Sequence, residues 1–458
     1  MKILITGATG LVGTRLVEKL LDRGYTDIRA LTRNVERAQK SSPLPIQFYE
    51  WNIKKSYIDS EALEDIDIIF NLAGENIADG RWTEAKKKRI LQSRTKAPKL
   101  IWDKLKIADR SPQKFISSSA VGIYGNRKDE VLDIHSSFGN DFLSHVCQEW
   151  EKAVQENKME GTKTHCLRTG VVLSDRGGAL MKMLPAFKAG IAGKLGNGLQ
   201  YMSWIHLDDL VDQFIFIMEN DLKESAYNGA SPNPVNNIEF TKVLGDVINR
   251  PTFLPVPSLA LKVIFGEMST VLLDGQRVQP SQLQAAGFKF TYPQLSSALE
   301  DLLKKKNEKE LLRYQIVPRP VEEIFNYFSQ GKNLEELTPS EMQFKMVGMN
   351  TAFIQKGSII DYSLKVHGIP LSWQAKISDY RENSYFIDEQ LKGPYSKWVH
   401  VHGFIQGDNG GTIVKDHVRY KIPGGFLGAL IAGPFIRKDI KNIFKYRFKT
   451  LEKKFSRL

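Results

Sequence analysis

The stretch TGATGLVG, from Thr6 to Gly13, decides the fold of the first part of this chain. It follows the apolar run KILI and leads into the helical pattern TRLVEKLLDRG. In this strand, turn and helix context, glycines at every third position are typical of a loop that binds the pyrophosphate of a dinucleotide. Gly7 permits the tight turn, Gly10 lets the backbone approach a pyrophosphate, and Gly13 allows the helix to pack closely on the strand.

The start of the helix adds N–H groups and a positive dipole end, which attract phosphate. A glycine-rich loop that binds no ligand is the alternative. We predict a dinucleotide site, and the residues expected to form it are Thr6, Gly7, Thr9, Gly10, Leu11, Val12 and Gly13.

The second apolar run indicates which dinucleotide is bound. About twenty residues after the glycines, an NAD-specific site places an acidic residue on the ribose 2′-hydroxyl. Here the run ends in LTR, with Thr32 and Arg33 at that place. Because a cation suits a 2′-phosphate, the sequence predicts NADP(H). The alternative is that Arg33 is only a solvated surface residue.

Apolar runs of strand length alternate with helical patterns over residues 1–175. The runs are KILIT, IRALT, IQFYEW, DIIFNLAG, KFISSS and THCLRTGVVL. This alternation is the pattern of repeated βαβ units and a buried parallel sheet. The sequence therefore predicts an α/β fold with a Rossmann-type, doubly wound parallel sheet.

The pattern changes after this region. Residues from about 176 to 300 are irregular and rich in Gly and Pro, which indicates a smaller substrate lobe with helices around Leu207–Met218 and Ile238–Ile248. The lysine-rich segment Lys304–Glu310 indicates a connection between domains. We therefore expect a first domain, including this lobe, over residues 1–303.

A second domain, of α+β type, is expected over residues 311–458. A helix is predicted near Pro320–Phe328, followed by period-two segments such as GSIIDYSLKV, SYFIDEQL and WVHVHGFIQ, and by a long amphipathic helix towards the C-terminus. The simplest architecture is several antiparallel strands wrapped around one long helix.

The composition is that of an ordinary globular protein, with 42% hydrophobic and 25% charged residues in a chain of 458. The net charge of +12 comes from mixed clusters such as EAKKKR (84–89) and KKKNEKE (304–310). Such clusters are usually solvated faces, so we expect no nucleic-acid partner. The two cysteines, Cys147 and Cys166, give no disulfide framework.

The longest apolar run, GGFLGALIAGPFI from Gly424 to Ile436, is too short to span a bilayer and is interrupted by Gly and Pro. A strand-like run directly follows Met1 and Lys2, which leaves no room for a signal peptide. We therefore expect a cytoplasmic protein with no integral membrane segment.

Five segments occur in one order: TGATGLVG, NLAG (Asn71–Gly74), SSSAVGIYG (Ser117–Gly125), LRTGVVL and WIHLDDL (Trp204–Leu210). Together they resemble the extended short-chain dehydrogenase/reductases, the superfamily of nucleotide-sugar epimerases. More narrowly, GENIADGRWTEAKKKRILQSRT, FLSHVCQEWE and QRVQPSQLQAAGFKFTYPQL resemble its atypical epimerase-like branch, which includes cell-division-inhibitor homologues. The resemblance covers about the first 300 residues.

This resemblance has implications for individual site residues. It places Leu72, Ala73, Gly74 and Ser117 against the cofactor. It also implies a serine that orients the substrate oxygen, a tyrosine that passes the proton, and a lysine that lowers the tyrosine pKa and holds the nicotinamide ribose. Ser119 matches the serine by its place in SSSA. The alternative for Ser119 is a strand-end hydroxyl that only caps backbone.

The tyrosine and lysine of this set are missing. Aligning the helix in GNDFLSHVCQEWEKAV (139–154) puts Cys147 at the tyrosine position and Glu151 at the lysine position. An anionic Glu raises the pKa of a neighbouring thiol, so the ordinary proton relay cannot operate. Glu151 can still accept hydrogen bonds from ribose hydroxyls. Packing is the preferred interpretation of Cys147. Tyr124 is the remaining candidate acid, with packing as its alternative.

The second domain carries a resemblance of its own. It contains PRPVEEIFNYFSQGKNLEELTP, GIPLSWQAKI, IDEQLKGPYSKWVHVHGF and GGTIVKDHVRYKIPGG, which resemble the START-related (SRPBCC) helix-grip superfamily. Members curl a sheet around a C-terminal helix to enclose an apolar cavity, so the resemblance implies a hydrophobic ligand. The residues expected to face the cavity are Leu427, Leu430, Ile431, Phe435 and Ile436. A solid core is the alternative.

Three histidines of this domain are candidates for a metal site. His400 and His402 alternate onto one face of a predicted strand, and His417 lies on a neighbouring strand. Imidazole suits zinc, so three histidines can bind it. Because no spacing motif accompanies them, we prefer hydrogen-bonded strand histidines and predict no metal site.

The leading interpretation is an NADP(H)-binding, epimerase-like oxidoreductase of a small-molecule substrate, fused to a hydrophobic-ligand domain. Its catalytic group is predicted to consist of Ser119, Tyr124, Cys147 and Glu151. The rival is a non-catalytic protein that uses NADP(H) occupancy to control a protein partner, which the missing Tyr and Lys favour.

Overall fold

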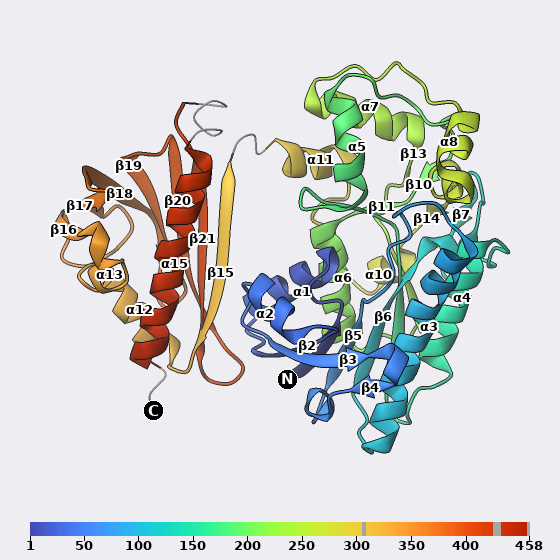
Figure 1. The fold of residues 1–458 in the computed structure, drawn as a ribbon, viewed down its shortest axis with the longest axis horizontal. Helices are drawn as coiled ribbons and strands as arrows, with labels where there is room; N and C mark the ends of the chain where they lie inside the picture. The colour runs from blue at the N-terminus through green and yellow to red at the C-terminus, as the bar shows by residue number, and fades with distance from the viewer. Residues whose placement is uncertain (305–307, 425–431, 456–458) are drawn as a thin grey trace. The chain divides into compact units, whose positions relative to one another are not determined.

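The computed structural model describes residues 1–304, 308–424 and 432–455 (Figure 1). These residues form two compact units, one from most of the chain before residue 305 and the other from most of the chain after residue 307. Each unit is built on a main sheet of its own. Among the described residues, no helix has both the length and the apolar composition needed to cross a membrane.

An eight-stranded sheet organises the larger unit, in the order β12-β8-β6-β5-β1-β2-β3-β4. Its strands are β1 (Lys2–Thr6), β2 (Asp27–Thr32), β3 (Gln47–Asn52), β4 (Tyr57–Ile58), β5 (Ile68–Asn71), β6 (Lys114–Ala120), β8 (Lys163–Thr169) and β12 (Ala226–Gly229). Every neighbouring pair is parallel except β3 and β4. The predicted Rossmann-type parallel sheet is therefore confirmed, and β4 and β12 are strands that the alternating pattern did not predict.

The order of strands reverses at β1. The chain passes from β1 to β2 on one side and later reaches β5 on the other side of β1. Ligands of open α/β sheets bind beyond the carboxyl ends of the strands at such a reversal. The loops that follow Thr6 and Asn71 therefore border the expected ligand crevice.

Helices cover both faces of this sheet (Figure 1). On one face, Trp102 of α3 (Glu84–Ile107) stacks on Phe115 of β6, with ring centroids 4.7 Å apart. On the other, Phe214 of α6 (Leu207–Glu219) lies edge-on to Phe70 of β5 at 6.1 Å. The further helices of these layers are α1 (Leu11–Asp22), α2 (Val35–Ser41), α4 (Phe142–Gln155), η1 (Ile53–Lys55), η2 (Ser60–Leu63) and η3 (Val121–Tyr124).

Helix α4 begins at a capped residue, which fixes the position of the residues that follow. The Asp141 side chain accepts the N–H of Ser144 at 2.9 Å, so one of the first unpaired N–H groups of the helix is satisfied. Because Cys147 and Glu151 are four residues apart, they lie on one side of α4. That side faces the sheet, since Glu151 bonds to side chains of β6 and β8.

The rest of the larger unit is a lobe of short elements. They are β7 (Val131–Leu132), β9 (Val171–Leu173), α5 (Gly178–Lys188), β10 (Tyr201–Met202), β11 (Trp204–His206), β13 (Val235–Asn236), α7 (Asn237–Ile248), α8 (Ser258–Phe265), η4 (Gly266–Ser269), α9 (Thr270–Leu273), β14 (Arg277–Val278), α10 (Ser281–Ala285) and α11 (Leu295–Leu303). The helix predicted at Ile238–Ile248 is confirmed as α7. The predicted lobe over about 176–300 needs correction, because α6 and β12 belong to the main sheet and its layers.

A seven-stranded antiparallel sheet organises the smaller unit, in the order β15-β21-β20-β19-β18-β17-β16. Its strands are β15 (Lys309–Val317), β16 (Lys345–Met349), β17 (Ile359–Val366), β18 (Ile369–Arg381), β19 (Tyr385–Lys392), β20 (Lys397–Gln406) and β21 (Thr412–Lys421). Its helices are α12 (Val321–Ser329), α13 (Asn333–Glu336), η5 (Ser340–Met342) and α15 (Gly433–Phe455). The predicted antiparallel sheet and long C-terminal helix are confirmed.

Helix α15 packs on this sheet through buried side chains. Ile440, Phe444 and Leu451 belong to apolar clusters that include strand residues. Phe435, which was predicted to face an internal cavity, is instead 69% exposed. Ile436 packs against the cluster around Phe444, so it contributes to a core. The predicted cavity residues Leu427, Leu430 and Ile431 lie outside the described residues.

The three histidines do not share one face. His400 and His402 lie on one face of β20, and each ring bonds to a carboxylate, as the sequence interpretation preferred. His417 lies opposite Val401 in the ladder, so it points to the other face. There its ring pairs with Glu310 at 2.6 Å. The predicted three-histidine zinc alternative is therefore wrong.

Candidate functional site

The loop between β1 and α1 has the geometry of a phosphate-binding turn. Gly7 has φ +75°, a left-handed conformation that favours glycine, and its oxygen accepts the N–H of Gly10 at 2.9 Å. A Cβ atom on Gly13 would lie 2.2 Å from the Gly7 oxygen, so the helix approaches the loop this closely only without a side chain there. The first and third glycines thus have the roles that their spacing predicts.

The residues from Thr9 to Val12 are at least partly open to solvent, whereas Ala8 is buried. Thr9 and Gly10 are exposed, and Leu11 and Val12 are half-buried where α1 begins. The first N–H groups of a helix have no partner within it, so they remain available to an anion. This end of the β1 crevice can therefore accept a phosphate group on backbone alone.

Thr6 and Ser117, predicted as cofactor contacts, are buried in a network that aligns three strand ends. The Thr6 hydroxyl donates to Asn71 Oδ1 at 3.0 Å, and Asn71 Nδ2 donates to the Ser117 hydroxyl at 3.0 Å. Thr6 Oγ1 also accepts the N–H groups of Leu72 and Ala73, at 3.0 and 3.1 Å. The side chains of Thr6, Asn71 and Ser117 are fully buried, so they set the position of the NLAG loop rather than line the crevice.

Arg33 stands at the end of β2 with a free guanidinium. It is exposed and forms no hydrogen bond or ion pair with the residues that the structure describes. The neighbouring Thr32 hydroxyl accepts the N–H of Asn34 at 3.3 Å, which shapes the turn after the strand. An exposed, unpaired guanidinium at this place is available to a phosphate group.

Glu151, at the predicted lysine position, is held in a buried ion pair with Arg168 of β8. Arg168 Nε and Nη2 donate to Glu151 Oε1 and Oε2, each at 2.9 Å, which is a bidentate arrangement. The Arg168 side chain is 4% exposed and the Glu151 side chain is 13% exposed. Ser119 Oγ also donates to Glu151 Oε1 at 2.7 Å. Both carboxylate oxygens are therefore used inside the protein, which leaves the predicted ribose contact of Glu151 without support.

Tyr124 has no proton to offer a substrate in this arrangement. Its side chain is fully buried, and its hydroxyl donates to Asn228 Oδ1 at 2.7 Å and accepts from Arg168 Nη1 at 2.9 Å. Burial raises the pKa of Tyr124, and the nearby Arg168 only partly opposes this shift. The structure thus places Tyr124 in the packing role that the sequence left as the alternative.

Cys147 is a buried thiol rather than a reactive one. Its side chain packs with Val121 and Ile123 and is 4% exposed. Burial, reinforced by the negative charge of Glu151, raises the pKa of Cys147 to about 12. At neutral pH the thiol keeps its proton, and only the thiolate is a strong nucleophile. The four predicted catalytic residues are brought together around the ion pair of Glu151 and Arg168, to which Ser119 and Tyr124 are hydrogen-bonded.

Arg94 of α3 is a candidate functional residue that the sequence reasoning missed. A Cβ atom on Gly74 would lie 3.3 Å from its Cζ, and the guanidinium lies 5.1 Å from the Trp150 ring centre. Nη1 donates to the backbone oxygen of Glu75 at 3.1 Å, and no carboxylate among the described residues pairs with it. Burial lowers its pKa, and Cys147 lies within electrostatic range. A half-buried cation that has Glu75 within electrostatic range, but forms no ion pair with a described carboxylate, therefore borders the predicted reaction position.

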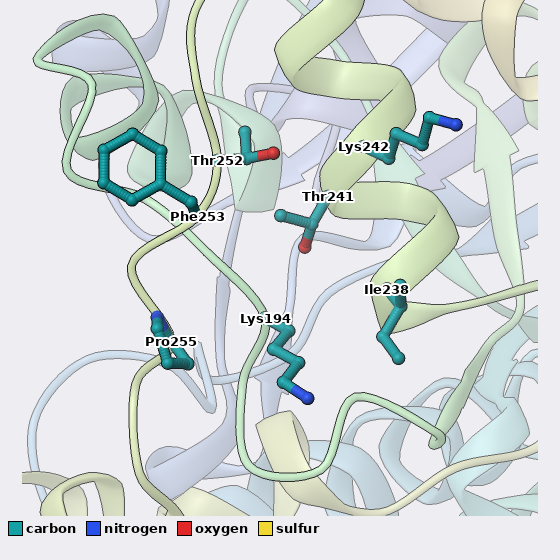
Figure 2. Close-up of a pocket in the computed structure, with 7 residues that line it drawn as sticks. All are labelled: Lys194, Ile238, Thr241, Lys242, Thr252, Phe253 and Pro255. Carbon is teal, nitrogen blue, oxygen red and sulfur yellow. The ribbon is translucent and has the colours of Figure 1, made fainter.

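A separate pocket of about 270 Å³ lies in the lobe of short elements (Figure 2). It is lined by Lys194, Ile238, Thr241, Lys242, Thr252, Phe253 and Pro255. None of the predicted site residues lines it. Its volume is also below that of typical small-molecule sites. The candidate site stays at the carboxyl ends of β1 and β5, where the predicted residues lie.

Comparison with known proteins gives the family. Residues 3–230 match the NAD dependent epimerase/dehydratase family, and residues 256–302 match a domain of unknown function, DUF1731. An epimerase family protein of Mycobacterium bovis is 39% identical over 298 residues, which cover 65% of this chain and 96% of that protein. This chain belongs to the epimerase family.

Two further epimerase family proteins are similar over the same region. The Arabidopsis thaliana SDR39U1 homologue, described as chloroplastic, is 38% identical over 306 residues, covering 66% of this chain and 87% of that protein. The crystal structure of human epimerase family protein SDR39U1 with NADPH has 29% identity and a TM-score of 0.60, covering 66% of this chain and 99% of that one. The dehydrogenase/reductase resemblance predicted for the first part of the chain is thus confirmed at the level of family.

Members of this epimerase family bind nicotinamide cofactors, with NADPH in the human relative.

The sequence held a signal for the buried role of Arg168, because a charged residue inside the apolar run THCLRTGVVL requires a buried partner. Arg94 had none, since it lies among the many basic residues of α3. Its place beside Gly74 follows only from the packing of the helix.

Both cysteines of this epimerase family chain are expected to be inert in the native state. At pH 8, a coloured disulfide reagent should modify neither Cys147 nor Cys166, because burial raises both thiol pKa values. In guanidinium chloride both should react. Rapid modification of Cys147 in the native protein would contradict its assignment as a packing residue.

Replacing Gly13 with Ala is expected to weaken nicotinamide cofactor binding. The new Cβ would collide with the Gly7 oxygen, so the loop must move, and we expect an increase in Kd of at least tenfold, about 1.4 kcal/mol. Fluorescence titration of the cofactor measures this. Gly348→Ala is the control, because a Cβ there meets no atom within 4 Å. A folded Gly13→Ala variant with unchanged affinity would contradict the assignment of this loop.

Proposed function

We propose that the larger unit binds NADP(H) in the crevice beyond β1, β2 and β5. The open N–H groups at Leu11 and Val12 bind the pyrophosphate, and Arg33 binds the 2′-phosphate. The proposal is supported by the free guanidinium of Arg33 and by the NADPH-bound human relative, which aligns over 66% of this chain. The half-buried and exposed backbone of Leu72, Ala73 and Gly74 lies on the nicotinamide side of the same crevice.

We propose further that the protein is a reductase of a small carbonyl substrate. When bound, the cofactor supplies a hydride. The observation that carries the proposal is the guanidinium of Arg94, which forms no ion pair with a described carboxylate and lies against Gly74, with Cys147 and Glu75 within electrostatic range. Such a cation stabilises the negative charge that develops on a carbonyl oxygen, or binds an anionic group of the substrate. The proton that completes the reduction comes from solvent water, because the hydroxyls of Ser119 and Tyr124 donate within the protein.

In this proposal, Glu151 and Arg168 are positioning residues. Their ion pair holds α4 against β6 and β8, and so keeps Cys147 packed beside the reaction position. The role of Cys147 is to exclude water and to shape the site. The tyrosine-type proton transfer of the resembled superfamily has no counterpart here.

For the smaller unit we propose a helix-grip fold that binds a hydrophobic small molecule. The support is its element order, in which one strand and two helices precede six further antiparallel strands and the long helix α15. The helix lies along the sheet with Phe444 and Leu451 buried between them. The ligand of this unit is a candidate substrate for the larger unit.

A second function is favoured by one observation. The polar groups of Ser119, Tyr124 and Glu151 are all satisfied internally, as expected for a protein that keeps cofactor binding without turnover. Such a protein would report NADP(H) occupancy to a protein partner.

Arg33→Asp tests the proposed cofactor. Since a carboxylate repels the 2′-phosphate but not a ribose hydroxyl, the variant should raise the Kd for NADPH at least tenfold and leave that for NADH nearly unchanged. Calorimetric titration measures both constants. Lys54→Asp, which makes a similar charge change at another exposed site, is the control. Equal losses for both cofactors would reject Arg33 as the phosphate contact.

Arg94→Gln tests the proposed reaction. Purified protein is mixed with NADPH and with metabolite fractions from cell extract, and NADPH absorbance is followed by stopped flow. At least one fraction should be reduced, and Arg94→Gln should lower kcat/KM by about 100-fold or more. Arg94→Lys should restore part of the rate, and Lys96→Gln, exposed on the same helix, should have no effect. Tight NADPH binding without turnover in any fraction would reject the reductase and select the occupancy-sensing function.

A further inference from the structure

A buried polar cluster lies in the smaller unit, between its sheet and α15. His400 and His402 project from one face of β20, with Asp388 opposite His400 on β19 and Asp416 opposite His402 on β21. Arg447 of α15 closes the cluster by donating to Asp416 at 2.5 Å. The histidines, Asp416 and Arg447 are each at most 6% exposed, and the Asp388 side chain is 18% exposed. We call these five residues the histidine cluster.

The hydrogen bonds of the histidine cluster indicate where its protons lie when Asp388 and Asp416 are ionised. His400 Nε2 lies 2.9 Å from Asp416, and His402 Nε2 lies 2.7 Å from Asp388, so each ring donates from Nε2 to a carboxylate. In the neutral rings, each Nδ1 is then unprotonated and presents a lone pair. His400 Nδ1 faces Asp388 Oδ2 at 3.5 Å, while His402 Nδ1 faces Asp416 Oδ1 at 3.9 Å and has no hydrogen-bond partner. Buried lone pairs that face carboxylate oxygens repel them, unless a cation lies between.

We propose that Asp388, His400 and His402 bind a divalent transition-metal ion of the zinc class. One ligand atom from each residue lies within 4.8 Å of the other two. Zinc bonds to nitrogen and oxygen of about 2.0–2.2 Å place tetrahedral ligand atoms roughly 3.3–3.5 Å apart. The 3.5 Å between His400 Nδ1 and Asp388 Oδ2 fits this geometry. His402 binds the metal through Nε2, and its proton moves to Nδ1, which faces Asp416 Oδ1 at 3.9 Å. The 2.7 Å contact between His402 Nε2 and Asp388 then opens by about 0.6 Å.

Asp416 and Arg447 support the metal ligands. By accepting the Nε2–H of His400, Asp416 leaves Nδ1 as the atom that binds the metal, and Arg447 holds that carboxylate in place. Two carboxylates and one guanidinium leave a net charge of −1, so a divalent ion brings the cluster to +1, which an anionic fourth ligand balances. Phe386 stacks on the His402 ring at 4.3 Å and gives the site an apolar wall.

Three protein ligands leave a fourth coordination position open, as in catalytic rather than structural zinc sites. That position can hold a water molecule or an anionic group such as a carboxylate.

Zinc binding to the full-length protein tests this assignment. The protein is treated with a chelator, then titrated with zinc alone by calorimetry, with Co²⁺ absorption as a second readout of coordination. We expect one zinc per chain, tetrahedral Co²⁺ bands in the visible range, and a loss of affinity of more than about 100-fold in His402→Gln. If circular dichroism shows that His402→Gln does not fold, Asp388→Asn is tested in its place.

His417→Gln is the matched control, because His417 lies on the opposite face of the same sheet and pairs with Glu310 at 2.6 Å. It should bind zinc as the unaltered protein does. Failure of the unaltered protein to bind stoichiometric zinc would overturn the assignment and leave a protonated polar cluster. Equal affinity in the unaltered protein and the folded cluster variant would overturn it as well, since the ion would then lie elsewhere.

Discussion

The ion pair between Glu151 and Arg168 is the interaction on which the candidate site depends. It is bidentate and buried, and it joins α4 to β8, to Ser119 on β6 and to Tyr124 beyond that strand. Removing one partner of such a pair leaves an uncompensated buried charge, at a cost of about 3–5 kcal/mol. The face of α4 that carries proton transfer in the resembled superfamily is therefore committed to a buried ion pair in this chain.

The glycine loop does not depend on the exchange of the superfamily's Tyr and Lys for Cys147 and Glu151. Its conformation follows from Gly7 and Gly13 and from the Thr6–Asn71 hydrogen bond, none of which involves α4. Cofactor binding can therefore persist after the proton-handling residues are exchanged. In the proposed reaction, Arg94 of α3 is the charged group beside the reaction position. In the smaller unit, the charged residues of the histidine cluster lie on the paired strands β19, β20 and β21 and on the helix α15.

Local patterns predicted the fold well. Glycine spacing, strand alternation and the missing Tyr and Lys are visible within short windows, so the parallel sheet, the loop and the change at Cys147 and Glu151 followed from sequence. Side-chain partners did not follow, because Arg168 is seventeen residues from Glu151 and Arg94 meets Gly74 only through helix packing. The strand register was not predictable either. It places Asp416, and not His417, on the same face as His400 and His402. The short strand β12 lacked an apolar run long enough to predict.

A double-mutant cycle on Glu151→Gln and Arg168→Met tests the central claim most directly. The free energy of opening of α4 and β8 is measured in the full-length protein by hydrogen exchange and mass spectrometry. If the pair is the structural constraint, each single variant loses about 3–5 kcal/mol, and the double variant loses clearly less than the sum of the two. Additive losses, or a Glu151→Gln variant as stable as the unaltered protein, would contradict the account.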